Sequence, residues 1–371
     1  MVHAWRSRLH MRGGHFLILA ICFLLMSCSK EEQATPGLPI SADFPGKFVF
    51  SKDADPENPV RDELYILDHQ GTRQITSTCN DPGCYKFAPA WMDAGRKIVW
   101  LNNSPDSLDG ILMIEPGGHI VKVLPGNPST FFSSMSISQD ERLMAVIGTD
   151  GIVIYNMGSS FSPVFVERIA SQQIGSIEWS PDKAKIACSS LVWENWNLIG
   201  TQFTVFSVDP PQPIFISGLH TYPLVAEFCS WSQLNTLVFE INGDIYTCLP
   251  DGTDRQEVTQ TSAYLELDPE WSPETDEIIY IKRAKDSIGI PDRILRFSPS
   301  LGVETEIFQS SEVSEINNLT WSPDGAYIVF SSGYFNKKPG PQTGMYIIHK
   351  DGTDLKRISG EVFKVFDWYT E

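Results

Sequence analysis

A short motif that recurs along the chain constrains the fold more than any other feature of the sequence. Its best copy is Trp-Ser-Pro-Asp-Gly at residues 321–325, and an apolar run follows at residues 328–330. Serine, proline and glycine in this order are typical of a type I turn. Proline fixes φ at the value that the second turn residue needs, and glycine at the last position avoids steric strain where the chain leaves the turn. A short apolar run after a turn favours a strand covered on both faces. The motif therefore predicts one corner of a buried β-hairpin.

Related copies of the motif divide the chain into units of similar length. The anchor residues that open the copies are Trp91, Ile137, Trp179, Trp231, Trp271 and Trp321. Successive anchors are 46, 42, 52, 40 and 50 residues apart, a period that indicates a stacked or radial array of repeats. Only neighbouring units can cover the apolar faces of such repeats, so we expect the anchor tryptophans to pack between units.

Each unit contains four short strand patterns, which we call a, b, c and d in chain order. In the last full unit, strand a ends at Trp321, strand b spans 327–330, strand c spans 345–348 and strand d spans 355–359. An Asp-Gly-Thr turn joins c to d, and it lacks the length and the final glutamate of a calcium-binding loop. Four antiparallel strands per period are typical of a propeller blade.

The two ends of the chain set the expected number of blades. Strand patterns b, c and d occur at residues 47–50, 63–67 and 73–76, without a strand a before them. Trp368 lies 47 residues after Trp321, without further strands behind it. We therefore expect an all-β fold with a single β-propeller, in which the Trp368 strand closes the N-terminal blade. This arrangement gives seven blades; six is the alternative, because one unit lacks the tryptophan.

The corner motif, the Asp-Gly-Thr turn and the closing Leu/Ile-Thr/Ser pairs together resemble the repeat of the TolB-like β-propellers, over residues 46–371. The resemblance implies the fold and says little about function, because these residues form turns and blade contacts. Some propellers of this kind are lyases that act on uronate oligosaccharides with a metal held by several histidines. Others regulate an appended serine hydrolase.

The first 27 residues have the pattern of a secretory signal. Three arginines precede an apolar run at 16–26, which is shorter than the about 20 residues of a membrane-spanning helix. The residues after the run resemble the lipobox of bacterial lipoproteins, which implies cleavage before Cys28 and acylation of its thiol. The expected parts are a signal peptide at 1–27, a lipid-anchored flexible tether at 28–45 and the propeller at 46–371.

These features predict export and attachment to the cell envelope through the N-terminal lipid. Ser29 stands in place of the aspartate that retains lipoproteins at the inner membrane, so we expect the outer membrane if the source has two membranes. Export also permits disulfides, and Cys79 and Cys84 flank a turn-rich loop suited to one. The alternative for this pair is two free thiols.

Composition and histidine placement narrow the classes of function. The formal charge of -18 disfavours nucleic acid as a partner. The histidines beyond the signal are His69, His119, His220 and His349. Three of them fall in or beside c–d turns of different blades, too far apart to share a metal, and no Gly-x-Ser-x-Gly motif occurs. We therefore expect no metal, no cofactor and a monomer.

Long connections single out one face of the predicted propeller. Strand alternation places all b–c and d–a connections on the same face, and five b–c connections are long. Those five are Ser51–Asp62, Asn102–Gly110, Ser189–Thr201, Lys282–Asp292 and Ser331–Gly344. Long connections in compact folds are often functional, and aromatic residues beside charges are typical of binding surfaces.

We therefore expect a scaffold that binds another envelope protein or a glycan through this face. The candidate partner-binding residues are Trp193, Glu194, Trp196, Arg283, Tyr334, Phe335, Lys337 and Lys338. The alternative is a lyase-like propeller that degrades a polysaccharide.

Overall fold

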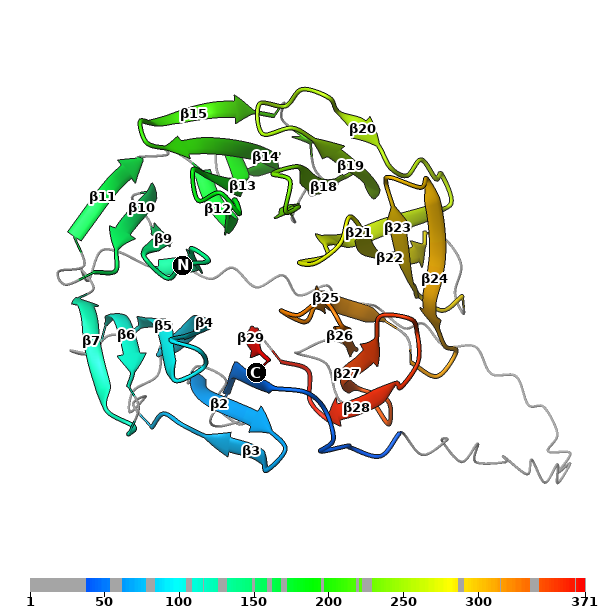
Figure 1. The fold of residues 1–371 in the computed structure, drawn as a ribbon, viewed down its shortest axis with the longest axis horizontal. Helices are drawn as coiled ribbons and strands as arrows, with labels where there is room; N and C mark the ends of the chain where they lie inside the picture. The colour runs from blue at the N-terminus through cyan, green and yellow to red at the C-terminus, as the bar shows by residue number, and fades with distance from the viewer. Residues whose placement is uncertain are drawn as a thin grey trace, which may run out of the picture. The chain divides into compact units, whose positions relative to one another are not determined.

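The propeller unit is built from strands alone in the part of the chain that can be described. The computed structural model describes residues 38–370, apart from 54–61, 78–83, 105–108, 116, 126–131, 149–150, 159–161, 168–171, 195–196, 218–219, 222–228, 286–289, 314, 334–339 and 364. Seven antiparallel sheets surround a central axis in this unit (Figure 1). The all-β, seven-bladed propeller is thus confirmed. Among the described residues, no helix is long and apolar enough to cross a membrane.

We number the blades from the one that contains both ends of the propeller, and list their strands from the axis outward. Blade 1 consists of β29 (Phe366–Tyr369), β1 (Lys47–Asp53), β2 (Asp62–Asp68) and β3 (Gly71–Gln74). Blade 2 consists of β4 (Tyr85–Met92), β5 (Lys97–Asn103), β6 (Gly110–Ile114) and β7 (Ile120–Pro125). Blade 3 consists of β8 (Phe132–Ile137), β9 (Leu143–Gly148), β10 (Gly151–Asn156) and β11 (Ser162–Glu167).

The remaining blades follow the same order. Blade 4 consists of β12 (Gln172–Trp179), β13 (Lys185–Glu194), β14 (Asn197–Val208) and β15 (Pro211–Ile216), with β16 (His220–Thr221) also paired to β14. Blade 5 consists of β17 (Cys229–Trp231), β18 (Leu237–Ile241), β19 (Asp244–Cys248) and β20 (Gln256–Glu257). Blade 6 consists of β21 (Tyr264–Trp271), β22 (Ile278–Ala284), β23 (Arg293–Ser298) and β24 (Val303–Gln309). Blade 7 consists of β25 (Ile316–Trp321), β26 (Tyr327–Ser332), β27 (Gly344–His349) and β28 (Lys356–Ser359).

Blade 1 closes the ring by joining the last strand to the first. β29 pairs antiparallel with β1, from Lys47↔Tyr369 to Phe50↔Phe366. The rings of Phe48 and Trp368 stack with their centroids 4.9 Å apart. The predicted closure by the Trp368 strand is therefore correct.

The motif serine organises each corner between strands a and b. The Ser322 side chain is fully buried, and its hydroxyl accepts the N–H of Ala326 at 3.1 Å and of Tyr327 at 2.9 Å. Gly325 closes the turn at a φ of +63°. The equivalent residues of three other corners adopt the same left-handed conformation without glycine: Glu141, Lys183 and Asn235. The buried serine therefore sets the corner, and glycine only relaxes it.

The anchor tryptophans lie between neighbouring blades, as predicted. Trp321 is 4% exposed and packs in a cluster with isoleucines of blade 6. Its indole N–H donates to the backbone oxygen of Glu270 in β21 of that blade, at 3.4 Å. The same bond joins Trp179 to Ser136 at 3.0 Å and Trp231 to Glu178 at 3.3 Å. Each of these tryptophans thus fastens its blade to the innermost strand of the preceding one.

Residues 189–201 were expected to form a long connection and instead form a β-hairpin. β13 and β14 stay paired from Lys185↔Ser207 out to Glu194↔Asn197, and β16 adds to the other edge of β14. Continued pairing satisfies backbone groups that an open loop would leave to water, and both strands are rich in β-branched and aromatic residues. The paired strands extend toward the face of the b–c connections.

Residues 38–45, which were assigned to the tether, lie against blades 7 and 1. The N–H of Ser41 donates to the carbonyl of Arg357 in β28 at 2.7 Å. Phe44 is 8% exposed in the core between these blades, and the carbonyl of Pro45 accepts the indole N–H of Trp368 at 3.2 Å. We call residues 38–45 the strap. The predicted signal peptide, Cys28 and the first part of the tether lie outside the described residues.

Candidate functional site

One residue in each blade, directly before the anchor position, lines an axial channel. These seven residues, which we call the channel ring, are Ala90, Ser136, Glu178, Ser230, Glu270, Thr320 and Asp367. Each follows the strand alternation: the anchor packs into the blade interface, and its predecessor faces the axis. Six of the seven side chains are polar, and three are carboxylates.

A β-bulge precedes the ring residue in several of the innermost strands. The register shifts between Phe87 and Ala90, between Leu267 and Glu270, and between Asn317 and Thr320. The bulges hold Ala88, Asp268 and Asn318 at positive φ. A bulge bends a strand and re-aims the side chains that follow it, which places the ring residue toward the axis.

The channel contains two adjoining cavities at the end where the corner motifs lie. Their volumes are about 450 Å³ and 640 Å³. Both are lined by Glu178, Asn318 and Asp367, and each also touches residues of the a–b corners, such as Pro323 in the smaller and Gln139 in the larger. The cavities therefore open toward the corner face, opposite the long connections.

Asp367 lies at the seam between blades 1 and 2. One carboxylate oxygen accepts the N–H of Trp91 in β4 at 2.7 Å, and the other accepts the N–H of Trp368 at 2.9 Å. Burial raises the pKa of Asp367 to about 6, although both hydrogen bonds oppose the rise. Asp367 thus has a structural role at the ring closure in addition to its place in the channel.

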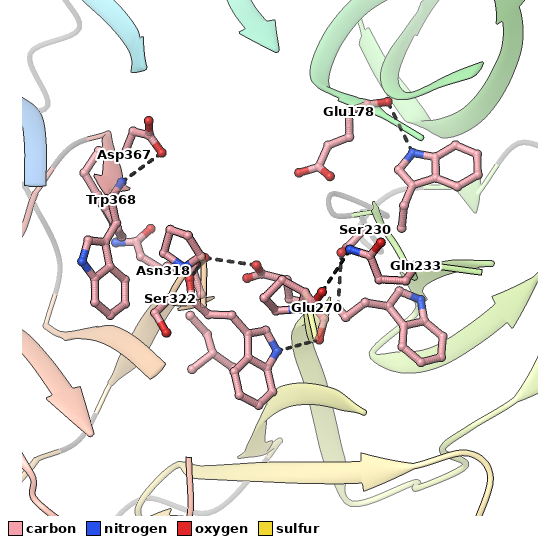
Figure 2. A pocket seen from close by; sticks show the side chains of 16 residues that line it. Glu178, Ser230, Gln233, Glu270, Asn318, Ser322, Asp367 and Trp368 are labelled. Atoms are coloured by element: carbon pink, nitrogen blue, oxygen red, sulfur yellow. Dashed lines mark hydrogen bonds between the residues drawn. The ribbon is translucent and has the colours of Figure 1, made fainter. Parts of the chain in front are cut away.

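Glu270 and Glu178 lie on the other side of the channel (Figure 2). The Glu270 carboxylate accepts the hydroxyl of Thr320 at 3.1 Å. Burial, followed by repulsion from Glu178, raises the pKa of Glu270 to about 8. The two carboxylates are therefore close enough to influence each other's charge.

Glu178 is the ring carboxylate without a hydrogen-bond donor among the described residues. Its side chain is exposed to the channel, and desolvation by the surrounding protein raises the pKa of the carboxylate to about 7. In Figure 2 its carboxylate points into the open space of the channel. Elsewhere in the described residues, as here, no three histidine, cysteine or acidic side chains are close enough to hold a metal ion.

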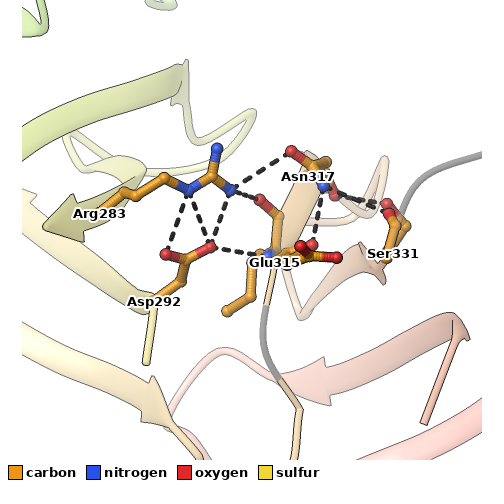
Figure 3. Close-up of polar contacts among 7 residues, drawn as sticks. Arg283, Asp292, Glu315, Asn317 and Ser331 are labelled. Carbon is orange, nitrogen blue, oxygen red and sulfur yellow. Dashed lines mark hydrogen bonds and ion pairs between the residues drawn. The ribbon is translucent and has the colours of Figure 1, made fainter. Parts of the chain in front are cut away.

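On the opposite face, Arg283 holds together strand ends of blades 6 and 7 (Figure 3). Its Nε and Nη2 donate to the Asp292 carboxylate at 3.0 Å and 2.8 Å, and Nη2 also donates to the carbonyl of Ile316 at 2.6 Å. Asp292 in turn accepts the N–H of Ile316 at 2.9 Å, and the Asn317 amide donates to the carbonyl of Gly333 at 3.3 Å. We call these five residues the clamp.

The clamp links residues at the strand ends from which two predicted long connections start. Arg283 and Asp292 stand at the two ends of the b–c connection of blade 6, and Gly333 begins that of blade 7. The Asp292 and Arg283 side chains are 7% and 24% exposed, so their ion pair is shielded from water. The clamp therefore fixes the spacing of the two connections.

The other predicted partner-binding residues are only partly described. Trp193 and Glu194 lie at the end of β13, where Glu194 is exposed. The rest lie outside the described residues: Trp196, Tyr334, Phe335, Lys337 and Lys338. Whether any of these residues contacts a partner stays a prediction.

Only one cysteine of the predicted disulfide lies among the described residues. Cys84 is disulfide-bonded, and Cys79 lies outside the described residues, so their pairing stays a prediction. Cys188 and Cys248 are buried and are not disulfide-bonded. The Cys84 backbone also links blades 1 and 2, since its carbonyl accepts the N–H of Asp62 at 3.0 Å.

The comparisons with known proteins establish the fold class. No protein-family model and no curated protein sequence matches this chain. Among solved structures, oligogalacturonate lyase from Vibrio parahaemolyticus is similar at 12% identity and a TM-score of 0.57, covering 85% of this chain and 86% of that one. A protein from Lactobacillus plantarum is similar at 10% identity and a TM-score of 0.60, covering 88% and 99%. TolB from Acinetobacter baumannii is similar at 14% identity and a TM-score of 0.49, covering 90% and 68%.

At these identities the two similarities with a TM-score above 0.5 show the propeller fold alone. The chain is thus a seven-bladed β-propeller with a carboxylate-bearing axial channel on one side and clamped connections on the other. Connection lengths in the sequence point to the opposite face and do not predict the channel ring. The sequence did carry a signal, because acidic residues directly precede two of the anchors, Trp179 and Trp271, and also Trp368.

Proposed function

We propose that this propeller is a binding scaffold of the bacterial cell envelope, attached to a membrane by a lipid on Cys28. Its partner is another envelope protein or a glycan, and it docks on the face of the b–c connections. In a source with two membranes, the anchor lies in the outer membrane. The observation that carries this proposal is the clamp around Arg283.

The clamp supports binding because it pre-orders what it holds. Two long connections that start from fixed points lose less conformational entropy when a partner docks than two that move independently. Four of the clamp's hydrogen bonds, including both Asp292–Ile316 and Arg283–Ile316, join blade 6 to blade 7 or tie a strand to a connection foot. A propeller needs no such cross-blade network for hairpins of two to five residues.

Cross-linking followed by pull-down from membranes tests the scaffold proposal. We would replace residues 286–289 and 334–339 by short Gly-Ser linkers and compare the retained proteins and glycans with those of the wild type. A matched control is Leu301→Ser, which changes a 75% exposed residue in a c–d turn on the other face. Loss of one defined partner in the linker variants, with retention in the control, is expected. Equal retention by the wild type, the linker variants and the control would refute docking on this face.

A lyase is the second candidate function, because an oligogalacturonate lyase shares the fold. That similarity carries no site residues at 12% identity. The carboxylates of the channel ring also repel an anionic uronate chain, which disfavours the channel as its binding place. Incubation with polygalacturonate and manganese, read by absorbance of the unsaturated product, distinguishes the two. Turnover above a heat-treated control would favour the lyase.

A further inference from the structure

We propose that Arg357 couples the strap to the connection face, so that the outer strap and the b–c connection of blade 7 are held or released together. The outer strap is residues 38–43. The connection end is residues 340–343, directly before β27. This inference rests on the proposed docking at the connection face and names what regulates it.

The outer strap is held mainly by polar contacts. Five of its six residues are exposed, among them Leu38 at 37% and Ile40 at 61%. Phe44, the next residue along the chain, is 8% exposed and packs in the core between blades 7 and 1. Segments with few buried apolar contacts open at a low cost in free energy. The outer strap can therefore be released as far as Phe44 while the core stays intact.

The Arg357 side chain bonds to both segments. Its Nη1 donates to the carbonyl of Leu38 at 3.3 Å, and its Nη2 donates to the carbonyl of Thr343. The Nε is buried and has no acceptor among the described residues. Two carbonyls, one from the outer strap and one from the connection end, thus position the guanidinium together. Loss of either carbonyl leaves a half-buried charged donor group less satisfied and weakens its hold on the other.

Gln342 forms a second link between the same two segments. Its Oε1 accepts the N–H of Leu38 at 3.3 Å, and its carbonyl accepts the hydroxyl of the fully buried Tyr346 at 2.7 Å. The connection end is also closed on itself, since the N–H of Gly340 donates to Oγ1 of Thr343 at 2.8 Å and the N–H of Thr343 donates to the carbonyl of Gly340 at 3.2 Å. The outer strap therefore binds to a turn whose geometry depends on the same residues.

Coupling between two sites is reciprocal. A partner that docks on the ordered connection stabilises the bound strap, and release of the strap weakens docking by the same factor. Release also lengthens the proposed tether, because six extended residues span at most about 20 Å. The strap thus regulates both the affinity of the connection face and the distance that the propeller can move from its proposed anchor.

Hydrogen exchange of the full chain, followed by NMR, tests the coupling from the strap side. Ser41→Pro removes the N–H that donates to the carbonyl of Arg357 at 2.7 Å, and it changes no residue of the connection end. We expect the amides of Leu38, Gly340 and Thr343 to exchange about fivefold faster, as for loss of one hydrogen bond. The matched control is Ser41→Ala, which keeps the N–H and should leave Gly340 and Thr343 unchanged.

Two results with Ser41→Pro would overturn the coupling. Faster exchange at Leu38 without a change at Gly340 and Thr343 would show that the connection end does not depend on the strap. Unchanged exchange at Leu38 would show that the outer strap is not released as a unit. Amides of β9 in blade 3 report global stability, and an equal acceleration there would assign the effect to the whole propeller instead.

Arg357→Met tests the coupling residue itself. Methionine fills similar space and has no donor, so we expect about tenfold faster exchange at both Leu38 and Thr343. Acceleration at only one of these amides would mean that the two segments are held independently, which contradicts the proposal. The docking proposal is tested separately by pull-down of the linker variants, and a connection face that binds a partner without strap coupling fails only the exchange experiment.

Discussion

The three carboxylates of the channel ring differ in how many donors the fold provides for them. Asp367 has two backbone N–H groups, Glu270 has one hydroxyl, and Glu178 has none among the described residues. Their pKa values are raised to about 6, 8 and 7, with burial as the largest cause in each. The folded protein therefore retains protons near neutral pH that the unfolded chain has already released.

Glu270→Gln is expected to remove part of the pH dependence of stability. The folded pKa of Glu270, about 8, lies above its usual value of 4.5, so ionisation opposes folding as the pH rises from 4.5 through 8. Glutamine keeps an oxygen for the Thr320 hydroxyl and has no charge. The variant should be about 4–5 kcal/mol more stable than the wild type at pH 8.5 and nearly equal to it at pH 4.

Urea unfolding at pH 4, 6 and 8.5 measures this difference, with Glu312→Gln as the exposed control. Parallel stability curves for the wild type and Glu270→Gln across that range would show that Glu270 ionises normally in the folded state.

The corner residues could be predicted from the sequence, whereas the ring could not be predicted with the same method. The Ser322 hydroxyl bonds to backbone groups within five residues, and proline restricts its own φ. The role of Ser322 and its copies can therefore be recognised from the neighbouring sequence. The role of Glu178 depends on blades that meet only in the folded ring. The sequence shows the acidic residue before the tryptophan, but only the folded ring shows that its carboxylate faces the axis.

At the scale of the strand, the innermost strand of each blade has two tasks. Its anchor packs into the blade interface, and the residue before it faces the channel. The hydrogen bond from the Trp321 indole to Glu270 connects the blade interface to the channel wall, because its acceptor is the backbone carbonyl of a channel-ring residue. Loss of the bond therefore affects the blade interface and the wall of the channel together.

Trp321→Phe and Trp271→Phe form a matched pair that measures this bond. Both tryptophans are 4% exposed, but only Trp321 has an acceptor for its indole N–H. Both variants lose packing volume, and Trp321→Phe also leaves the Glu270 carbonyl without that donor. We expect Trp321→Phe to be the less stable variant by about 1 kcal/mol in chemical denaturation. An equal loss would mean that the 3.4 Å bond contributes nothing.

Arg283→Lys tests the clamp at the same scale. Lysine keeps the charge next to Asp292 but cannot make the forked contact and still reach the carbonyl of Ile316. We expect faster proteolysis within the connections 286–289 and 334–339, with a loss of about 1–2 kcal/mol in global stability. Cleavage at the wild-type rate in both connections would show that the clamp does not order them.

Strand positions followed from the sequence more closely than connections did. Strand b of blade 7 was expected at 327–330 and spans Tyr327–Ser332, and strand c was expected at 345–348 and spans Gly344–His349. The extended hairpin of blade 4 was missed because hairpin pairing beyond the blade depends on a facing strand, and a third strand, β16, also supports it. The residue pattern within one strand does not show which other strands will pair with it.

At the scale of the whole propeller, closure depends on close approach of backbone to backbone. Gly46 lies at a φ of +72° next to the end of β29, and a Cβ added there would lie 2.1 Å from the carbonyl oxygen of Tyr369. The strap reaches this point from blade 7, where Lys356 forms an ion pair with Asp43 at 3.0 Å. Strap, β1 and β29 thus meet at one place in the ring.

Gly46→Ala is expected to destabilise the closed ring by about 3 kcal/mol or more, because the backbone of β29 must move. Gly302→Ala is the matched control: its φ is +64°, but a Cβ there meets no atom within 4 Å. It should lose only about 1 kcal/mol from the unfavourable backbone conformation. Thermal unfolding of the two variants measures the difference, and similar losses would mean that closure tolerates a shift of β29.

The pairing of Lys47 with Tyr369 also has a consequence for the order of events during synthesis. Six blades are made of strands adjacent in sequence and can form as the chain leaves the ribosome, but β1 cannot complete its pairing until β29 has been translated. Until then its inner edge presents unpaired backbone groups, the kind of edge on which chains of the same sequence associate. The nascent propeller therefore has a late window of aggregation risk, which ends only when β29 has left the ribosome and paired with β1.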